Sequence, residues 1–423
     1  ILFLIKIFIK LERQSMKKKD KIKGVNNIKI ILFFLYILIF YIFGADPEKI
    51  KYSEIILLAF IGLEFLSIVK TGKIKYCIPI IIVFIFSFYC FLSNLWAIDS
   101  ELAVSRAKTL MILAVFLLVA YNFFSNIEDG ENKLLKIIMY AGTIFSVYVI
   151  MYYGIGEYIN KLISGERIGT EINNVNVIGL QTSISSIIAI FYGLYDGKKR
   201  YFLLSIIPLM VSLGTGSRKV IVLIVFGITL LFILKKEGKV SLIKSAKKII
   251  TFAIIVVVFM LILRLPMFST IYERMEMTIN GVMGKGKFDS STELRKSYIK
   301  AGMDQFFEKP FCGVGIANSS YITMQEVGRT TYLHNNYVEL LATTGIIGFC
   351  LYYSVYCYII INCIEMLKTK NKYINVSLVI FLTNMILEYG MVSYYSKSTY
   401  IYILIGLITI QKARKESVDE KGN

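Results

Sequence analysis

The chain has 423 residues, of which 56% are hydrophobic and 18% are charged, and its formal net charge is +19. Soluble domains contain about half apolar and about a quarter charged residues. This composition and a mean hydropathy of +0.65 therefore exclude an ordinary soluble protein. The Lys-rich segments lie between long apolar segments, which is typical of membrane topology and does not indicate a nucleic-acid partner.

Twelve apolar segments approach the length of about 20 residues that a transmembrane helix needs. The sequence therefore predicts an all-α, polytopic membrane protein. Its predicted spans are residues 30–44, 53–69, 76–97, 107–125, 134–154, 174–195, 201–214, 219–234, 249–265, 343–366, 373–389 and 398–411. When these spans alternate in direction, the basic segments 10–29, 70–75, 196–200, 235–248, 368–372 and 411–415 fall on one side. By the positive-inside rule this side is cytoplasmic, and an even number of spans places both termini there.

The predicted organisation has five parts. They are a basic cytoplasmic leader (1–29), spans one to nine (30–265), one large extracytoplasmic loop (266–342), spans ten to twelve (343–411) and a cytoplasmic tail (412–423). Residues 1–15 precede Met16, which opens an ordinary basic leader, and we interpret them as upstream translation rather than native structure. Five of the six cysteines fall within spans, so the sequence predicts neither a disulfide framework nor a metal quartet.

The loop 266–342 has the character of a folded segment. An amphipathic helix is predicted over 290–309, because Ser290 and Glu293 have the spacing of a capping box and Pro310 supplies a stop. Its apolar residues recur at helical spacing: Leu294, Tyr298, Ile299, Met303, Phe306 and Phe307. A Gly-containing turn (311–320) and a polar stretch lead to His334, and a second helix is predicted from Asn335 to Gly345. Long loops with their own structure are usually functional.

Three arginines on the outward side of this topology stand out: Arg167 before span six, Arg218 in the turn between spans seven and eight, and Arg295 on the loop helix. Positive residues are biased to the other side, so these three depart from the rule. A guanidinium grips phosphate bidentately and keeps its charge. Each arginine alone is better explained as an ordinary headgroup contact or surface ion pair. As a set they indicate a pyrophosphate-binding surface.

His334 is the only histidine of the chain. An imidazole titrates near neutrality and can take a proton from a hydroxyl as general base. Its alternative role is structural, as a cap or a loop hydrogen bond. If the following helix began at His334, Tyr337, Val338 and Leu341 would share its face, whereas Glu339 would point away from the imidazole.

A lone histidine excludes a multi-histidine zinc site. The outer-loop carboxylates are scattered and form no D-x-D pair, namely Asp289, Glu293, Asp304, Glu308 and Glu326. We therefore expect a reaction without a metal or other cofactor. No P-loop or dinucleotide fingerprint is present in the sequence, so ATP-driven transport has no support.

Four stretches resemble the O-antigen ligase and polysaccharide polymerase superfamily of bacterial membrane glycosyltransferases. HNNYVELLATTGIIGFCLY (334–352) is similar to its histidine, asparagine, glutamate and paired-glycine signature, and EKPFCGVGIANS (308–319) to its Pro-x-x-Gly-x-Gly turn. LGTGSRKVIVLIVFGI (213–228) resembles its Gly-Ser-Arg hairpin, and RIGTEINNVNVIG (167–179) its Arg-Gly-to-Asn stretch. The resemblance covers residues 165 to 352, and the rest of the chain matches only as a series of spans.

The resemblance implies a metal-independent glycosyltransferase bundle in the bacterial plasma membrane. A glycan on undecaprenyl pyrophosphate would be the donor, and an acceptor glycan hydroxyl outside the cell would receive it. The lipid bilayer and a chain-length regulator are further expected partners. By resemblance, Arg218 and Arg295 bind the pyrophosphate, Arg167 supports them, and His334 activates the acceptor. Asn174, Asn176, Asn335 and Glu339 are candidate substrate contacts. This chain has Asn-Asn-Val-Asn where the family commonly has Asn-Pro-Asn, so either Asn174 or Asn176 takes the corresponding part.

Other functions remain open at this point. The motifs favour a polymerase of capsule or O-antigen repeat units, but they do not separate it from a ligase that moves the finished glycan to a lipid or protein anchor. A flippase or exporter would place its charges near the membrane midplane, whereas these candidate residues lie at the outer rim. A scaffold for other envelope enzymes would tolerate single changes at Arg218, Arg295 or His334.

Overall fold

The computed structural model describes residues 21–235, 269–283 and 290–419, together with residues 250, 257, 261, 264, 265 and 285. Most of the leader, most of the predicted span 249–265 and the last four residues of the tail lie outside the described residues. Within the described part every regular element is a helix, as the sequence predicted. The chain divides into two compact units, residues 1–73 with 127–275 and residues 74–126 with 276–423.

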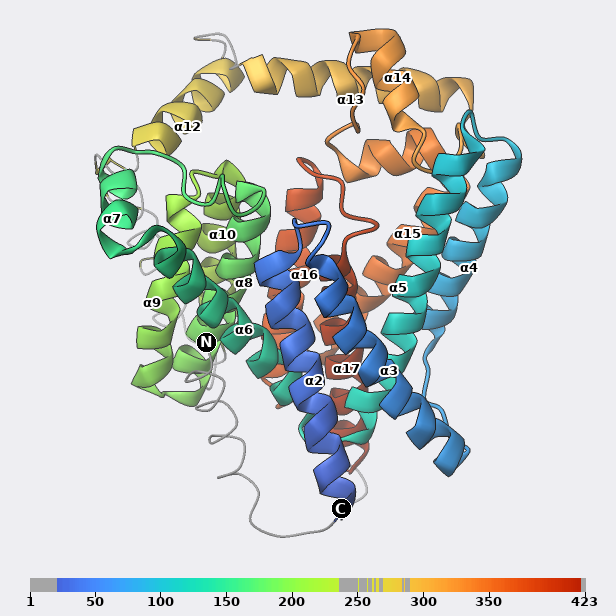
Figure 1. Cartoon of the computed structure of the whole chain (residues 1–423), viewed down its shortest axis with the longest axis vertical. Helices are drawn as coiled ribbons and strands as arrows, with labels where there is room; N and C mark the ends of the chain where they lie inside the picture. Colours follow the sequence, from blue (N-terminus) through green and yellow to red (C-terminus); the bar gives the residue numbers. More distant parts are fainter. Residues whose placement is uncertain are drawn as a thin grey trace. The chain divides into compact units, whose positions relative to one another are not determined.

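The first unit is built from long apolar helices and one short amphipathic helix. Its helices are α2 (Lys21–Phe43), α3 (Ile50–Thr71), α6 (Gly130–Tyr153), α7 (Ile155–Ile163), α8 (Val175–Asp196), α9 (Lys199–Gly214) and α10 (Arg218–Leu234) (Figure 1). Helix α12 (Ser269–Val282) begins in this unit, where Tyr272 and Met275 pack against a core of Leu213, Val220, Ile221 and Ile224. Helix α7 was not predicted from the sequence.

Small residues allow two helices of this unit to pack closely. A Cβ atom on Gly142 of α6 would lie 2.5 Å from the Cβ atom of Ser185 on α8. The Ser185 hydroxyl donates to the carbonyl of Met139 at 2.5 Å, across the same interface. Glycine and serine at a helix contact are typical of membrane bundles, where close backbone approach replaces the hydrophobic driving force.

Helices α2 and α3 pack side by side and share a buried ion pair (Figure 1). Lys29 Nζ lies 2.7 Å from a carboxylate oxygen of Glu64, and the two side chains are 2% and 5% exposed. The same ammonium donates to Ser67 Oγ at 2.6 Å. A buried pair is stable only when both charges are present, because either ion alone keeps its desolvation cost.

We expect Lys29→Met to destabilise the protein by about 3–5 kcal/mol, because Glu64 loses its cation. The double variant Lys29→Met with Glu64→Leu should recover most of this loss. Equilibrium unfolding of the detergent-solubilised protein measures both. Equal stability of the Lys29→Met variant and the wild type would show that the ion pair contributes little.

The second unit contains the loop helices as well as apolar helices. Its elements are α4 (Ile78–Leu92), the 3₁₀ turn η1 (Ser93–Leu95), α5 (Ser100–Asn126), α13 (Ser290–Glu308), α14 (Ser319–Val327), α15 (Asn336–Met366), α16 (Tyr373–Glu388) and α17 (Lys397–Asp419). Helix α13 confirms the predicted loop helix, with Pro310 two residues past its end. Helix α14 was not predicted, because its polar sequence has no clear apolar period.

The apolar side of α13 forms a core with the chain around His334. Tyr298 and Ala301 of this helix pack with Leu333, Val338 and Ala342, and Leu294, Ile299 and Met303 lie against them. A Cβ atom on Gly302 would lie 2.5 Å from Val338 Cγ1, so glycine permits this close packing. Phe307, which the sequence grouped with this side, is instead 71% exposed.

Helix α15 is interrupted at Gly345, where the sequence predicted a helix end. Gly345 has φ 64° and ψ −171°, a backbone region that only glycine occupies readily. The turn that follows α13 crosses the chain at this break: Ile346 N donates to Pro310 O at 2.8 Å and Gly315 N to Thr343 O at 2.9 Å. The segment with the paired glycines and the Pro-x-x-Gly-x-Gly turn therefore contact each other through backbone hydrogen bonds at this crossing.

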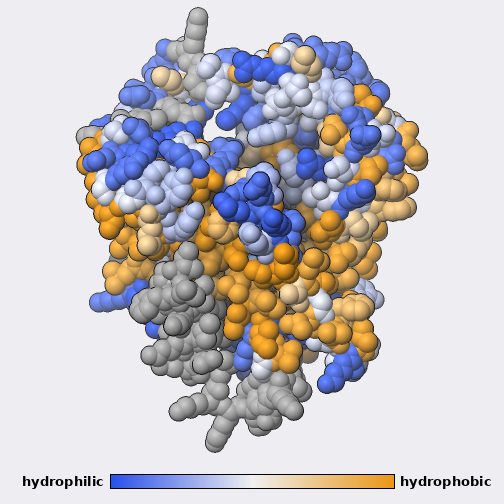
Figure 2. Space-filling model, in the orientation of Figure 1, coloured by the Kyte–Doolittle hydropathy of each residue, from blue (hydrophilic) through white to orange (hydrophobic). Residues whose placement is uncertain are grey.

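A described helix covers each of the predicted spans except 249–265. In the part of the chain that the structure describes, seven helices are long and apolar enough to cross a membrane, and Tyr373–Glu388 is a shorter apolar helix. The outer side chains of α3 are apolar and exposed, with Ile55, Leu58 and Leu66 at 61%, 66% and 64%. Hydrophobic residues also cover much of the face shown in Figure 2. These features are those of a multi-pass membrane protein. The count of twelve, the orientation and the extracytoplasmic position of residues 266–342 stay predictions.

Candidate functional site

His334 lies in the short connection between α14 and α15, immediately before the helix. Its φ is +56°, a left-handed conformation that is uncommon for a residue with a side chain. Asn335 follows as the N-cap of α15, and its side-chain oxygen accepts from Val338 N at 3.1 Å. His334 thus has a strained backbone conformation directly before the N-cap of α15. Backbone strain of this kind often marks functional positions.

Two tyrosine rings contact the imidazole. The ring centroid of Tyr332 lies 4.1 Å from that of His334, and the ring of Tyr298 stacks at 5.6 Å with an interplanar angle of 19°. Tyr298 comes from α13, one helical turn after Arg295, so the loop helix supplies both an aromatic wall and the predicted arginine.

Arg295 acts electrostatically on the same group of residues. Burial raises the pKa of Tyr332, and the positive charge of Arg295 opposes that rise. The second unit therefore brings together two of the residues predicted from the sequence, His334 and Arg295, around Tyr332. A base beside a cation is the combination that acyl- or glycosyl-transfer chemistry needs for proton removal and charge stabilisation.

Glu339 has a structural role in this arrangement. It is 2% exposed, and its carboxylate accepts from Ser319 Oγ at 2.6 Å and from the backbone N–H of Leu333 at 2.9 Å. Neither bond goes to the imidazole. These bonds agree with the expectation that Glu339 points away from the imidazole, although His334 precedes the helix and does not share its face. Glu339 orients the histidine through the backbone of the preceding residue.

Sequence analysis missed Asn336, which joins the site to a buried carboxylate. Its Oδ1 accepts from the backbone N–H groups of Ser393 and Tyr394 at 2.9 and 3.0 Å, and its Nδ2 donates to the Tyr353 hydroxyl at 2.9 Å. Tyr353 in turn donates to Glu388 at 2.8 Å. Glu388 also accepts from Tyr356 and Ser393. In the sequence, the signal for this network is Glu388, a carboxylate within the apolar segment 373–389.

We expect Asn336→Leu to destabilise the protein by about 2–4 kcal/mol, because two backbone N–H groups and one hydroxyl lose their buried partner. Thermal unfolding of the detergent-solubilised protein measures the change. Asn94→Leu is the matched control, since the side chain of Asn94 makes one hydrogen bond, to Phe91 O. An Asn336 variant as stable as this control would show that the segment after Glu388 is held in another way.

The first unit brings together the other predicted residues. Arg167 Nε donates to Thr215 O at 2.9 Å, and the neighbouring Ile168 N donates to Gly214 O at 2.9 Å. Gly216 has φ +64°, and a Cβ there would lie 3.0 Å from Arg167 Cγ, so the glycine makes room for the arginine stem. Arg167 is therefore hydrogen-bonded to the turn that contains the Gly-Ser-Arg motif. Arg218 of this motif is the first residue of α10 and is half-buried.

The two candidate asparagines have different contacts. Asn174 is the N-cap of α8, and its side chain accepts from Asn176 N at 2.9 Å. Asn176 accepts from the Ser217 hydroxyl at 2.8 Å. Asn176 is thus the asparagine that joins the Arg167 stretch to the hairpin, a distinction that spacing alone could not make.

A cavity of about 330 Å³ lies in the second unit beside Tyr332. It is lined by α5, by the start of α14, by Thr331 and Tyr332, and by Tyr394 and Tyr395, and it contains Arg106 and Glu339. Arg106 lies on α5, which starts at Ser100, and was not among the arginines that the sequence singled out. Arg106 nevertheless satisfies the criterion that selected the other arginines, since the connection between spans three and four is outward in the predicted topology.

Within the described residues, no group of three His, Cys, Asp or Glu side chains is arranged to hold a metal ion. Asp289 lies outside the described residues, and Glu293 pairs with Lys296 on α13 at 3.6 Å. The expectation of a metal-independent reaction stays a prediction.

Comparison with known families agrees with the resemblance seen in the sequence. The family model described as O-Antigen ligase, Wzy_C, matches residues 203–353. The match includes the Gly-Ser-Arg hairpin, α13, the crossing at Gly345 and His334. No curated protein matches the chain.

Proposed function

We propose that this chain is a glycosyltransferase of the O-antigen ligase and polymerase superfamily that polymerises surface polysaccharide, and the family match over residues 203–353 supports this proposal. Its donor is a repeat-unit glycan on undecaprenyl pyrophosphate, and its acceptor is a sugar hydroxyl at the outer face of the membrane. The observation that carries the proposal is the single histidine, held between two tyrosines on a strained backbone in the same unit as Arg295.

The proposed reaction is a displacement at the anomeric carbon. The acceptor hydroxyl oxygen forms the new bond to that carbon while His334 takes the hydroxyl proton. The bond from the anomeric carbon to the pyrophosphate oxygen breaks, and the lipid pyrophosphate leaves with the electron pair. Arginines that are already in place stabilise the charge developing on the leaving group, which is usually the largest catalytic contribution.

In this proposal Arg295 is the pyrophosphate-binding residue of the second unit. Arg218, with Arg167 as a supporting residue, is the candidate that the resemblance gives within the first unit. Asn176 positions the Arg218 hairpin in this proposal through its bond to Ser217, and Asn174 acts through the cap of α8. Asn335 and Glu339, which the resemblance suggested as substrate contacts, use their side chains to cap α15 and to hold Leu333.

The second candidate is a ligase that transfers the finished glycan to a lipid or protein anchor, and the description of the matching family favours it. The two functions differ in the acceptor and share the chemistry at His334. They are distinguished by what accumulates when the protein is absent.

The test is deletion of the gene in its host, with the wild-type chain restored on a plasmid as control. Surface glycan is separated on a gel, and the lipid-linked pool is extracted. Single repeat units on the carrier lipid in the deletion strain support the polymerase. Long chains retained on the carrier lipid support the ligase and contradict polymerisation. An unchanged glycan in both fractions would contradict glycan transfer altogether.

A further inference from the structure

The cavity beside Tyr332 has the composition of a sugar-binding site. Its volume of about 330 Å³ is at the lower end of ligand pockets, which measure roughly 300–1,000 Å³, and suits one or two sugar units. Tyrosine rings from two separate segments, Tyr332 and Tyr394–Tyr395, line it together with the hydroxyl groups of Ser319, Ser320 and Thr331. Aromatic faces can stack against the C–H face of a sugar ring, and hydroxyls can pair with its substituents.

Arg106 gives this cavity a cation with one unpaired N–H donor. Its Nε is buried and has no hydrogen-bond partner among the described residues. The guanidinium carbon lies 3.5 Å from the ring centroid of Tyr395, so a cation–π contact holds the group in place without pairing its N–H donors. A buried donor on a charged group is costly when unpaired, and a ligand that supplies an acceptor removes that cost.

The carboxylate of the cavity does not neutralise Arg106 by direct pairing. Glu339 accepts hydrogen bonds from Ser319 and Leu333, and none of the ion pairs within the described ranges joins it to Arg106. Arg106 and Glu339 attract each other electrostatically without forming an ion pair. The guanidinium fork can therefore also grip an oxyanion bidentately.

We propose that this cavity binds the acceptor glycan through a sugar that carries an anionic substituent, a carboxylate or a phosphate, gripped by Arg106. The inference rests on the proposed function and adds to it the class of acceptor. Tyr332 connects the two sites, because it lines the cavity and its ring centroid lies 4.1 Å from that of His334. A sugar held by Arg106 would bring its neighbouring hydroxyl to the base.

The test measures binding of small sugars to the full-length protein in detergent, by saturation-transfer NMR. Methyl glucuronide and glucose 6-phosphate probe the two anionic classes, and methyl glucoside is the neutral comparison. We expect one of the anionic sugars to bind at least tenfold more tightly than methyl glucoside. Arg106→Gln should weaken that sugar at least tenfold, and Arg106→Lys, which keeps the charge but loses the fork, by a smaller factor.

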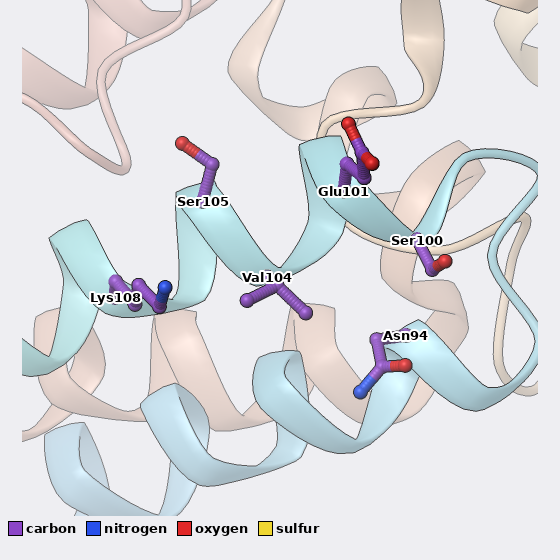
Figure 3. A pocket seen from close by; sticks show the side chains of 6 residues that line it. All are labelled: Asn94, Ser100, Glu101, Val104, Ser105 and Lys108. Atoms are coloured by element: carbon purple, nitrogen blue, oxygen red, sulfur yellow. The ribbon is translucent and has the colours of Figure 1, made fainter.

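Lys108→Gln is the matched control. It removes a positive charge from the same helix, two residues further on, in a separate shallow depression lined by Asn94, Ser100, Glu101, Val104, Ser105 and Lys108 (Figure 3). Its binding should equal that of the wild type. Thermal unfolding of each variant separates lost binding from lost folding, and Arg106→Lys keeps the test decisive if Arg106→Gln does not fold.

Three results would overturn the proposal. They are equal binding of neutral and anionic sugars, binding that is indifferent to both Arg106 variants, and displacement of the sugar by inorganic pyrophosphate, which would make the cavity part of the donor site. The His334→Asn variant separates this inference from the proposed function. It should bind the anionic sugar normally and fail to transfer glycan. Normal glycan transfer by this variant would contradict the role of His334 as general base, but it would not affect the proposal that the cavity binds an anionic sugar.

Discussion

Replacing His334 should reduce glycan transfer by about 10²–10⁴-fold, the range that a positioned general base contributes. His334→Asn is the sharper variant, because asparagine tolerates the left-handed conformation at φ +56° whereas alanine adds strain there. The asparagine variant therefore removes the base and keeps the backbone. Transfer is measured in the native host as the amount and length of surface glycan, with membrane abundance followed by immunoblot.

The matched control for this variant is Tyr321→Phe on α14, which removes a phenol oxygen that donates to Asp99 and does not line the cavity. Its transfer should stay within a few-fold of the wild type. A normal glycan ladder from His334→Asn at normal abundance would remove the histidine from the mechanism. It would favour a role for this segment in structure alone, as in a scaffold protein.

Gly345→Ala should cost roughly 4 kcal/mol or more of stability. Two effects combine. A Cβ atom at this position would lie 2.1 Å from the carbonyl oxygen of Phe311, and the backbone angles, φ 64° and ψ −171°, strain any residue with a side chain. Since backbone atoms of the crossing turn cannot move aside cheaply, the turn or the helix break must be lost.

Trp96 provides the measurement. It is the only tryptophan of the chain, and its Nε1 donates to the carbonyl of Cys312 at 3.1 Å, within the crossing turn. Its fluorescence therefore reports on the turn during thermal unfolding. Gly328→Ala is the control, because Gly328 has a similar φ of +72° with open space around it, and we expect it to cost about 1 kcal/mol. Equal stability of the two variants would mean that the crossing adapts to a methyl group.

The amino-acid sequence by itself determined the helical membrane fold, the loop helix and the residues worth testing. Apolar runs, the stop at Pro310 and the helix end at Gly345 are local signals, and each depends on only a few consecutive residues. The sole histidine and the outward arginines were visible for the same reason. Local patterns nevertheless do not identify the hydrogen-bond partners of a side chain. Asn174 and Asn176 are two residues apart in sequence, yet one caps a helix and the other binds a hairpin 41 residues away.

Only the tertiary structure decided how these residues are held. It gave His334 a left-handed conformation in the connection before α15, gave Glu339 a backbone partner, and placed Phe307 in an exposed position on the loop helix. It also revealed Arg106, most of whose neighbours in the cavity are residues more than 200 positions later in the chain. Side chains so far apart in sequence meet only because the helices pack against each other. Packing depends on shape complementarity between distant segments, and the hydrophobic periodicity of one segment does not identify its packing partner.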